Sequence, residues 1–152
     1  MRNATIFFLV VFLFSCSENI HQEYYSFNSN GWNTDSIVTY QYMIIDTTKE
    51  YKLSLNIRHT VDYKFQNLFL FLDGSHKDTI EINLADKNGK WIGSGISDIR
   101  ELNYVFHYDK VFYKKGKHSL SVEQAMRYGP EEKIKNLEQI VDIGLIVSEN
   151  NE

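Results

Sequence analysis

The sequence predicts an all-β fold, an antiparallel β-sandwich of jelly-roll or Ig-like type with about 7–9 strands and minimal helix. Three observations predict it. Apolar and polar residues alternate with period two in several runs. Turn-forming pairs that contain glycine separate these runs at the spacing expected of a sandwich or barrel. Helical periodicity is nearly absent. We expect residues 36–152 to form one β-sandwich domain.

The individual strands follow from the alternating runs. In residues 51–59, "YKLSLNIRH", every second residue is apolar, so one face of this strand is expected to be buried. Residues 65–73, "FQNLFLFLD", are apolar on both faces, which predicts a central strand. Further strands are expected in residues 38–44, 78–86, 103–113, 117–125 and 139–149. Residues 130–139, "PEEKIKNLEQ", are the one candidate helix, at most about two turns long.

The N-terminus has the form of an export signal. Met1 and Arg2 precede an apolar run over residues 4–14, which is shorter than the ~20 residues of a bilayer span. The end of this run, "LFSC", resembles the lipobox of bacterial lipoproteins, in which the signal peptide is cut before a lipid-modified cysteine. We therefore expect a signal peptide over residues 1–15 and lipidation of Cys16, with residues 16–35 as a tether. An ordinary signal peptide with an incidental cysteine is the alternative.

Composition limits the cellular compartment in which the protein is expected and the classes of partner that it is expected to bind. Cys16 is the only cysteine, so the mature domain has no disulfide and no thiol nucleophile or metal ligand. Ser17 follows Cys16 where an Asp would favour retention at the inner membrane, which favours an outer-membrane location. The net charge is −4 and no basic stripe is present, which argues against nucleic acid as a partner.

Residues 84–99, "LADKNGKWIGSGISDI", are dense in glycine and charge and have the look of a ligand loop. Their spacing matches neither a phosphate-binding loop, nor a dinucleotide fingerprint, nor a calcium loop. Asn88-Gly89 instead predicts a type I′ hairpin turn with Trp91 on the return strand, and two glycines then permit a bend before Asp98. If this segment has a role beyond the fold, we expect contact with a partner.

Other tests for catalytic and metal motifs fail. No serine lies in a G-x-S-x-G elbow, and no two histidines have the short spacing typical of zinc sites. We therefore expect no cofactor and no metal, and a hydrolase is the weakest of the functional hypotheses.

Two sets of residues allow alternative interpretations. Trp32 and Trp91, with ten tyrosines in the chain, could form a sugar-stacking platform, or they could pack in the core and in cross-strand pairs. The glutamate and arginine of "EQAMR", Glu123 and Arg127, could pair with each other or tie down the loop that follows.

Several stretches together resemble the GldH family of gliding-motility lipoproteins, and the resemblance extends from the lipobox to the last strand. They are Gly31-Trp32, residues 46–63 ("DTTKEYKLSLNIRHTVDY"), residues 67–71 ("NLFLF"), residues 84–99, residues 123–127 ("EQAMR") and residues 141–145 ("VDIGL").

The resemblance implies a palmitate-bearing, lipid-anchored protein of the cell envelope that serves the gliding and type IX secretion apparatus as a structural or accessory component. Its partners would be the membrane and other envelope proteins of that apparatus. The family offers no catalytic residue to transfer, so the resemblance implies that the chain is not an enzyme. A glycan-binding surface lipoprotein is the alternative. Residues singled out as partner contacts or fold determinants are Trp32, Arg58, Trp91, Asp98, Glu123 and Arg127.

Overall fold

The computed structural model describes residues 19–130 and 132–150, and this part of the chain contains ten strands and no helix. The strands are β1 (Asn19–Ser26), β2 (Trp32–Asn33), β3 (Val38–Ile44), β4 (Glu50–Thr60), β5 (Asn67–Asp73), β6 (Lys77–Asn83), β7 (Ile99–Val111), β8 (Gly116–Gln124), β9 (Asn136–Leu137) and β10 (Ile140–Glu149). No helix of these residues is long and apolar enough to cross a membrane.

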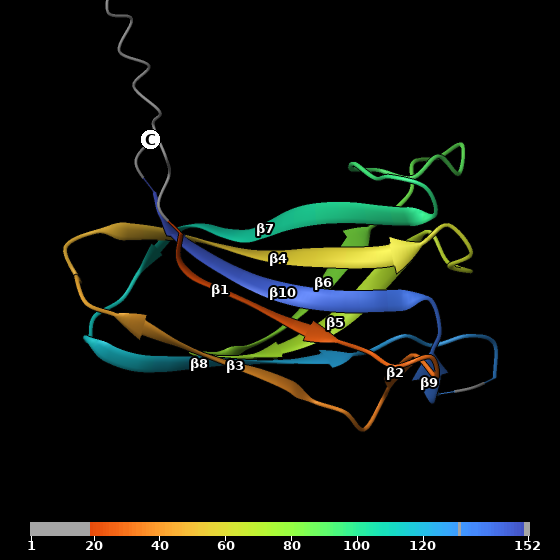
Figure 1. Ribbon diagram of the computed structural model, residues 1–152. Coiled ribbons are helices and arrows are strands. Elements are labelled where there is room, and N and C mark those ends of the chain that lie inside the picture. The colour runs from red at the N-terminus through yellow and green to blue at the C-terminus, as the bar shows by residue number, and fades with distance from the viewer. Residues whose placement is uncertain (1–18, 131, 151–152) are drawn as a thin grey trace, which may run out of the picture.

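Two four-stranded sheets face each other (Figure 1). Sheet 1 has the order β1-β10-β4-β7 and sheet 2 the order β3-β8-β5-β6, with every pairing antiparallel. The short strands β2 and β9 form a separate pair. The eight long strands are connected in the order of a jelly roll, so the prediction of a sandwich is confirmed and its jelly-roll form applies.

The core lies between the two sheets and is built from the predicted alternation. On β4, Tyr51, Leu53, Leu55 and Ile57 point inward and are buried. The facing strands contribute buried side chains at every second position: Val38, Tyr40, Tyr42, Ile44, Leu68, Leu70, Leu72, Leu120 and Val122. Strand β5 lies between β8 and β6, which confirms the prediction of a central strand. Its outer residues, Phe69 and Phe71, are half-buried.

The helix prediction for residues 130–139 is wrong. The described part of this segment makes turns and then forms β9, where Leu137 lies opposite Trp32. Its backbone bonds go to neighbouring segments: Ile134 donates to the carbonyl of Met126, and Lys135 accepts from the N–H of Thr34. Burial of Leu137 against the core outweighs the weak helical preference of this short segment.

The predicted tether also needs correction. From Asn19 onward the polar lead-in forms β1, which pairs along its length with β10 at the edge of sheet 1. Its polar composition reflects an edge strand that is largely exposed. Part of the predicted tether therefore belongs to sheet 1, while the predicted signal peptide and Cys16 lie outside the described residues.

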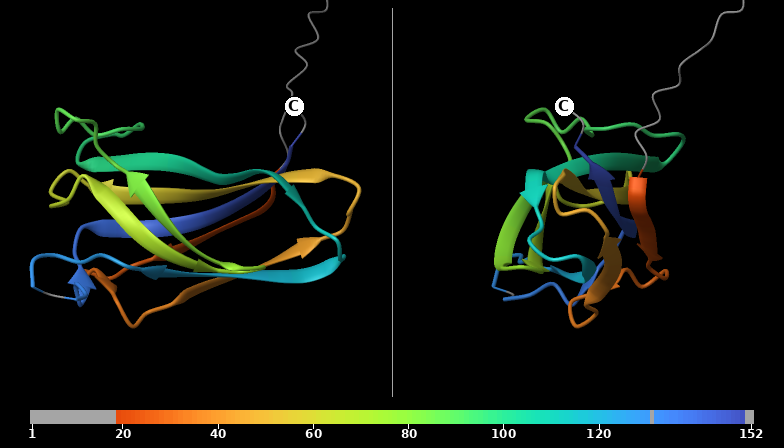
Figure 2. Two further views of the ribbon diagram at one scale, coloured as in Figure 1. Left: turned by 180° about the vertical axis from the view of Figure 1, so that it is seen from behind. Right: turned by 90° about the vertical axis from the view of Figure 1, so that its left-hand side faces the viewer.

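The sandwich has two ends (Figures 1 and 2), and we call the end at which β1 begins the near end and the opposite end the far end. At the near end, β1 begins, β10 ends, β4 begins and β7 ends, as the pairs Asn19–Ser148, Ser148–Lys52 and Tyr51–Lys110 show. At the far end, β4 ends and β7 begins, and residues 84–98 lead into β7. The 13 residues of β7 span about 40 Å between the two ends.

Candidate functional site

The last residues of β4 connect several segments at the far end of sheet 1. Arg58 pairs with Asp142 of β10, and the next residue, His59, packs against Trp91. Thr60 donates its backbone N–H to Gln139, and Val61 donates its own to the carbonyl of Asp98 over 2.8 Å. The stretch "NIRHTV" thus holds together β10 and the 84–98 segment, which are far apart in the sequence.

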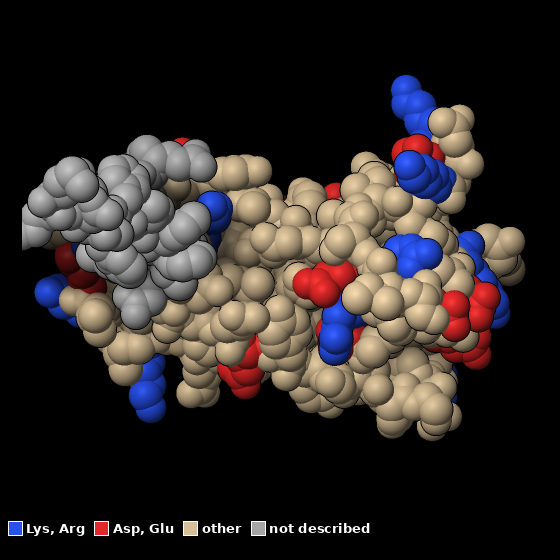
Figure 3. Space-filling view, turned by 45° about the horizontal axis from the view of Figure 1, so that its top comes forward, with Lys and Arg blue, Asp and Glu red and all other residues tan. Residues whose placement is uncertain are grey.

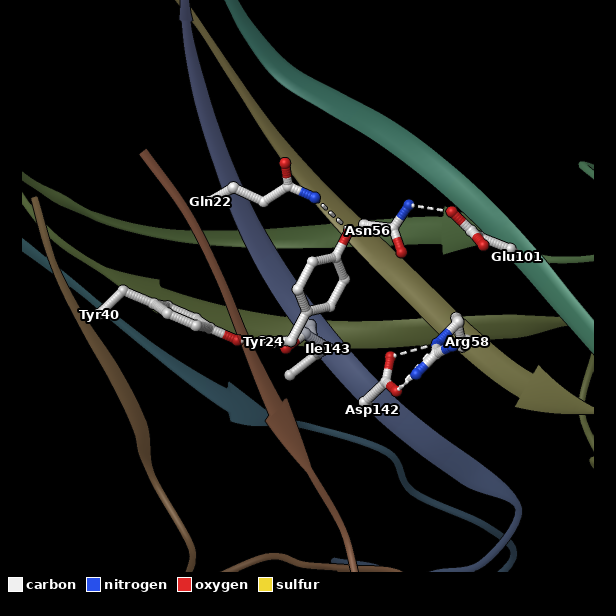
Figure 4. Close-up of polar contacts among 8 residues, drawn as sticks. All are labelled: Gln22, Tyr24, Tyr40, Asn56, Arg58, Glu101, Asp142 and Ile143. Atoms are coloured by element: carbon white, nitrogen blue, oxygen red, sulfur yellow. Dashed lines mark hydrogen bonds and ion pairs between the residues drawn. The ribbon is translucent and has the colours of Figure 1, made fainter. Parts of the chain in front are cut away.

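The strongest of these links is the ion pair between Arg58 and Asp142 (Figure 4). Nε of Arg58 donates to both carboxylate oxygens of Asp142 at 2.9 Å, and Nη2 donates to Oδ2. Asp142 is 0% exposed, whereas the Arg58 side chain is 43% exposed. The hydrogen bond to Asp142 raises the pKa of Arg58. The carboxylate is enclosed and saturated by arginine, so it is suited to fixing structure and not to acting on a substrate.

Hydrogen bonds and close packing extend this arrangement across the outer surface of sheet 1, which we call the polar face: Gln22, Tyr24, Asn56, Arg58, Glu101 and Asp142. Asn56 is buried and donates to Glu101 over 2.9 Å. Gln22 donates to the Tyr24 hydroxyl over 3.1 Å. The Tyr24 ring covers Gly144, where an added Cβ would lie 2.5 Å from it. From the core side, the Tyr40 hydroxyl donates to the carbonyl of Ile143 over 2.7 Å.

His59 lies beneath this surface as a buried neutral base. Its Nδ1 is 2.8 Å from the carbonyl of Thr60, and its ring meets Trp91 edge-on with centroids 4.6 Å apart. Within the described chain, Nε2 is buried without a hydrogen-bond partner. Burial lowers the pKa of His59, so the ring is uncharged at neutral pH.

We expect acid to destabilise the fold through His59. The unfolded chain binds a proton at His59 near the ordinary histidine pKa of 6.5, while the folded chain resists it. The free energy of unfolding should therefore be constant above this pH and fall as the pH drops below it. Urea unfolding between pH 8 and 5 measures this slope. A His59→Gln variant should lose that part of the slope, and an unchanged slope would contradict the assignment.

The turn in residues 84–99 differs from the sequence prediction. Gly89 has a φ of +79°, but Asn88 does not have a positive φ, so the predicted type I′ turn is wrong. The carboxylate of Asp86 accepts the N–H groups of Asn88 and Lys90 at 2.8 and 2.9 Å, and its carbonyl accepts that of Gly89. The Asp86 side chain thereby stabilises a three-residue loop in which glycine alone takes the left-handed conformation.

The glycines that follow hold the segment against β7. Ser94 and Glu101 exchange backbone hydrogen bonds of 3.0 and 2.8 Å. Gly93 has a φ of +90°, and a Cβ there would collide with the Glu101 carbonyl. The predicted glycine-permitted bend is thus present, and it fixes a segment whose Ile96 is 88% exposed.

Replacing Gly93 with alanine should release this segment from β7. The substitution combines an unfavourable φ with a backbone clash, for which we expect a loss of about 1–3 kcal/mol. Amide hydrogen exchange at Ser94 and Glu101 should quicken, because these two residues hold the bridge. Gly116→Ala is the matched control, since Gly116 also has a positive φ but an added Cβ there meets nothing within 4 Å. Equal exchange rates in both variants would contradict the role of close packing.

The two tryptophans do not form an exposed platform. Trp32 is 0% exposed, stacks on Phe27 with centroids 4.7 Å apart, and donates Nε1–H to the carbonyl of Ser36 over 2.9 Å. Trp91 is half-buried, with its ring edge-on to His59. Core packing, the alternative interpretation, therefore accounts for Trp32 and removes it from any sugar-stacking platform.

The "EQAMR" stretch ties down the following loop. Glu123 lies 3.4 Å from Lys133, so the alternative in which it pairs with Arg127 is wrong. The inward residues, which sequence reasoning missed, make the stronger contacts. Gln124 donates to Ile134 over 2.7 Å, and the Met126 sulfur accepts the N–H of Phe69 over 3.2 Å. Continuing the alternation of β8 inward from Val122 would have located both.

Of the six residues singled out from the sequence, the structure brings Arg58, Trp91 and Asp98 together around the end of β4. Trp32, Glu123 and Arg127 lie outside that group. Asp98 contributes its backbone carbonyl, and its side chain is exposed. Sequence reasoning missed Asp142. A signal was available in "VDIGL": Asp142 points to the other face of the strand from its core-facing neighbour Ile143, and a charge in that position needs a partner on the adjacent strand.

Comparison with known proteins identifies the family. The family model described as GldH lipoprotein matches residues 19–147. The chain is 34% identical over 163 residues to "Gliding motility lipoprotein GldH homolog" of Christiangramia forsetii, with 99% of both chains covered. It is 34% identical over 160 residues to "Gliding motility lipoprotein GldH" of Flavobacterium johnsoniae, again with 99% of both covered. The chain therefore belongs to the GldH family of gliding-motility lipoproteins.

Proposed function

We propose that this chain is a lipid-anchored outer-membrane protein that serves the gliding and type IX secretion apparatus as a structural component. It is not an enzyme in this proposal, and its partners are other envelope proteins of that apparatus. Family membership supports the link to gliding and to lipidation. The lipobox at Cys16 and the Ser17 that follows it supply the sequence support for an outer-membrane anchor.

One structural observation carries the proposed mode of action: the separation of the two ends. Asn19, where β1 begins at the near end, is only three positions after Cys16, so the linking chain spans at most about 11 Å. The 84–98 segment lies at the opposite end of β7, about 40 Å away. A lipid at Cys16 would thus hold the near end at the membrane and present the far end to a partner.

The far end has the properties of a contact surface. Its 84–98 segment is fixed to β7 by the Ser94–Glu101 bridge and to β4 by Val61 and His59, so little conformational entropy is lost on binding. Ile96 presents an apolar side chain from this rigid base. On the face of the molecule that Figure 3 shows, acidic and basic side chains are interspersed. This arrangement suits a protein partner better than a polyanion.

Gene deletion and complementation test this function. Deletion should abolish colony spreading and the export of surface adhesins, and the wild-type gene should restore both. Cys16→Ala should restore neither, because the protein would lose its lipid, while a neutral change such as Ser17→Thr should restore both. Normal spreading and secretion in the deletion strain would contradict the proposal.

A further inference from the structure

We infer that the near end of the sandwich is a second membrane contact, at which Tyr113, Ile45 and the lysine pair Lys114-Lys115 dock on anionic phospholipid headgroups. This inference rests on the proposed lipidation of Cys16. It adds a surface that fixes the orientation of the domain on the bilayer, which a lipid at Cys16 alone would leave undetermined.

Strand pairing places these residues beside the start of β1. Val111 lies opposite Glu50, and Ile44 lies opposite Gly116, so residues 45–49 and 112–115 form adjacent loops. Both loops close the end of the sandwich at which Asn19 enters sheet 1 (Figures 1 and 2). With at most about 11 Å of chain back to Cys16, a lipid there would bring this end to the headgroup layer.

The loops expose the side chains that a bilayer interface favours. Tyr113 is 91% exposed and Ile45 is 71% exposed. Their neighbours point the other way: Phe112 is buried against Tyr42 and Tyr51 with centroids 6.0 and 5.5 Å apart, which fixes the loop backbone beneath Tyr113. Tyrosine concentrates at membrane–water interfaces because its ring is apolar and its hydroxyl is polar.

The charges around this tip favour an anionic surface. Lys114 and Lys115 adjoin Tyr113, and both are exposed. Of the acidic groups nearby, Glu149 is paired with Lys49 over 2.6 Å. Asp109 and Asp46 accept hydrogen bonds from the neutral side chains of Asn150 and Thr48 and keep their charge, so the attraction to an anionic surface comes from Lys114 and Lys115. The lysine pair can reach lipid phosphates while its stems lie along the interface.

Spin-label accessibility on the full lipidated chain in vesicles tests the inference. Vesicles contain phosphatidylethanolamine and phosphatidylglycerol, and a nitroxide is attached through Tyr113→Cys or, as the matched far-end control, Ile96→Cys. Lipidation consumes the thiol of Cys16, so each variant carries one reactive thiol. Both sites are among the most exposed in the described chain, so the substitutions should leave thermal unfolding unchanged.

We expect collisions with a water-soluble nickel relaxant to fall several-fold at residue 113 on vesicle binding and to stay unchanged at residue 96. Lys114→Glu with Lys115→Glu should reverse part of this protection, and only when phosphatidylglycerol is present. Equal accessibility at both positions on floating vesicles would overturn the inference and leave the lipid anchor intact. Failure of the wild-type chain to float, with no acyl mass on the N-terminal peptide, would overturn the anchor and with it this inference.

Discussion

Replacing Arg58 with methionine is expected to reduce the free energy of unfolding by about 3–5 kcal/mol at neutral pH. The reason is the asymmetry of the pair: Asp142 is fully buried, so removal of the guanidinium leaves an uncompensated charge inside the protein. Arg58→Lys should recover only part of this loss, because an ammonium cannot reproduce the bidentate contact. Urea denaturation of the three proteins gives the comparison.

Two controls separate the effect of losing the ion pair from a general loss of stability on replacing an arginine. Arg127→Met removes an exposed arginine outside the polar face and should change stability by less than about 0.5 kcal/mol. The double variant Arg58→Met, Asp142→Leu should recover most of the lost stability, because it leaves no buried charge. A single Arg58→Met variant that is as stable as the wild type would show that the pair does not hold β4 to β10.

Replacing Trp32 with alanine is expected to cost about 3–5 kcal/mol, as for other fully buried large aromatics. The change removes the stack on Phe27, the hydrogen bond to Ser36 and the packing under the β2–β9 pair. Thermal unfolding measures the loss. Trp91→Ala, at a half-buried site, should cost less.

The Trp32→Ala variant also discriminates core packing from sugar binding. A tryptophan that served as a sugar platform would lose glycan binding on replacement and keep its stability. Retention of the wild-type unfolding temperature in Trp32→Ala would therefore contradict the packing assigned here. Trp32→Phe, which restores the stacking ring without the Nε1 donor, should fall between the wild type and alanine.

The fold was predictable from sequence because core-facing residues recur at every second position along a sandwich strand. The alternation in β4 identified Tyr51, Leu53, Leu55 and Ile57 as core residues before any pairing was known. The strand β1 was not predictable in this way. It lies at a sheet edge with most of its side chains exposed, so its composition resembles a linker, and only its pairing with β10 makes it a strand.

The candidate site was less predictable, because its parts meet only through pairing register. Arg58 and Asp142 are 84 positions apart in the sequence, and nothing local indicates that they lie opposite each other. The turn at Asn88-Gly89 was misassigned for a local reason: Asp86 reaches forward to two backbone N–H groups and stabilises a longer loop. In "EQAMR", polarity drew attention to Glu123, whereas the inward Gln124 makes the buried contacts.

Colony spreading of a deletion strain that carries Ile96→Glu tests the central claim most directly. The far-end segment is proposed to contact a partner through Ile96, so a charge there should abolish spreading while the protein stays folded, abundant and bound to the envelope. Ile37→Glu, at another exposed isoleucine outside the 84–98 segment, should spread normally. Wild-type spreading by Ile96→Glu at equal protein abundance would contradict the account.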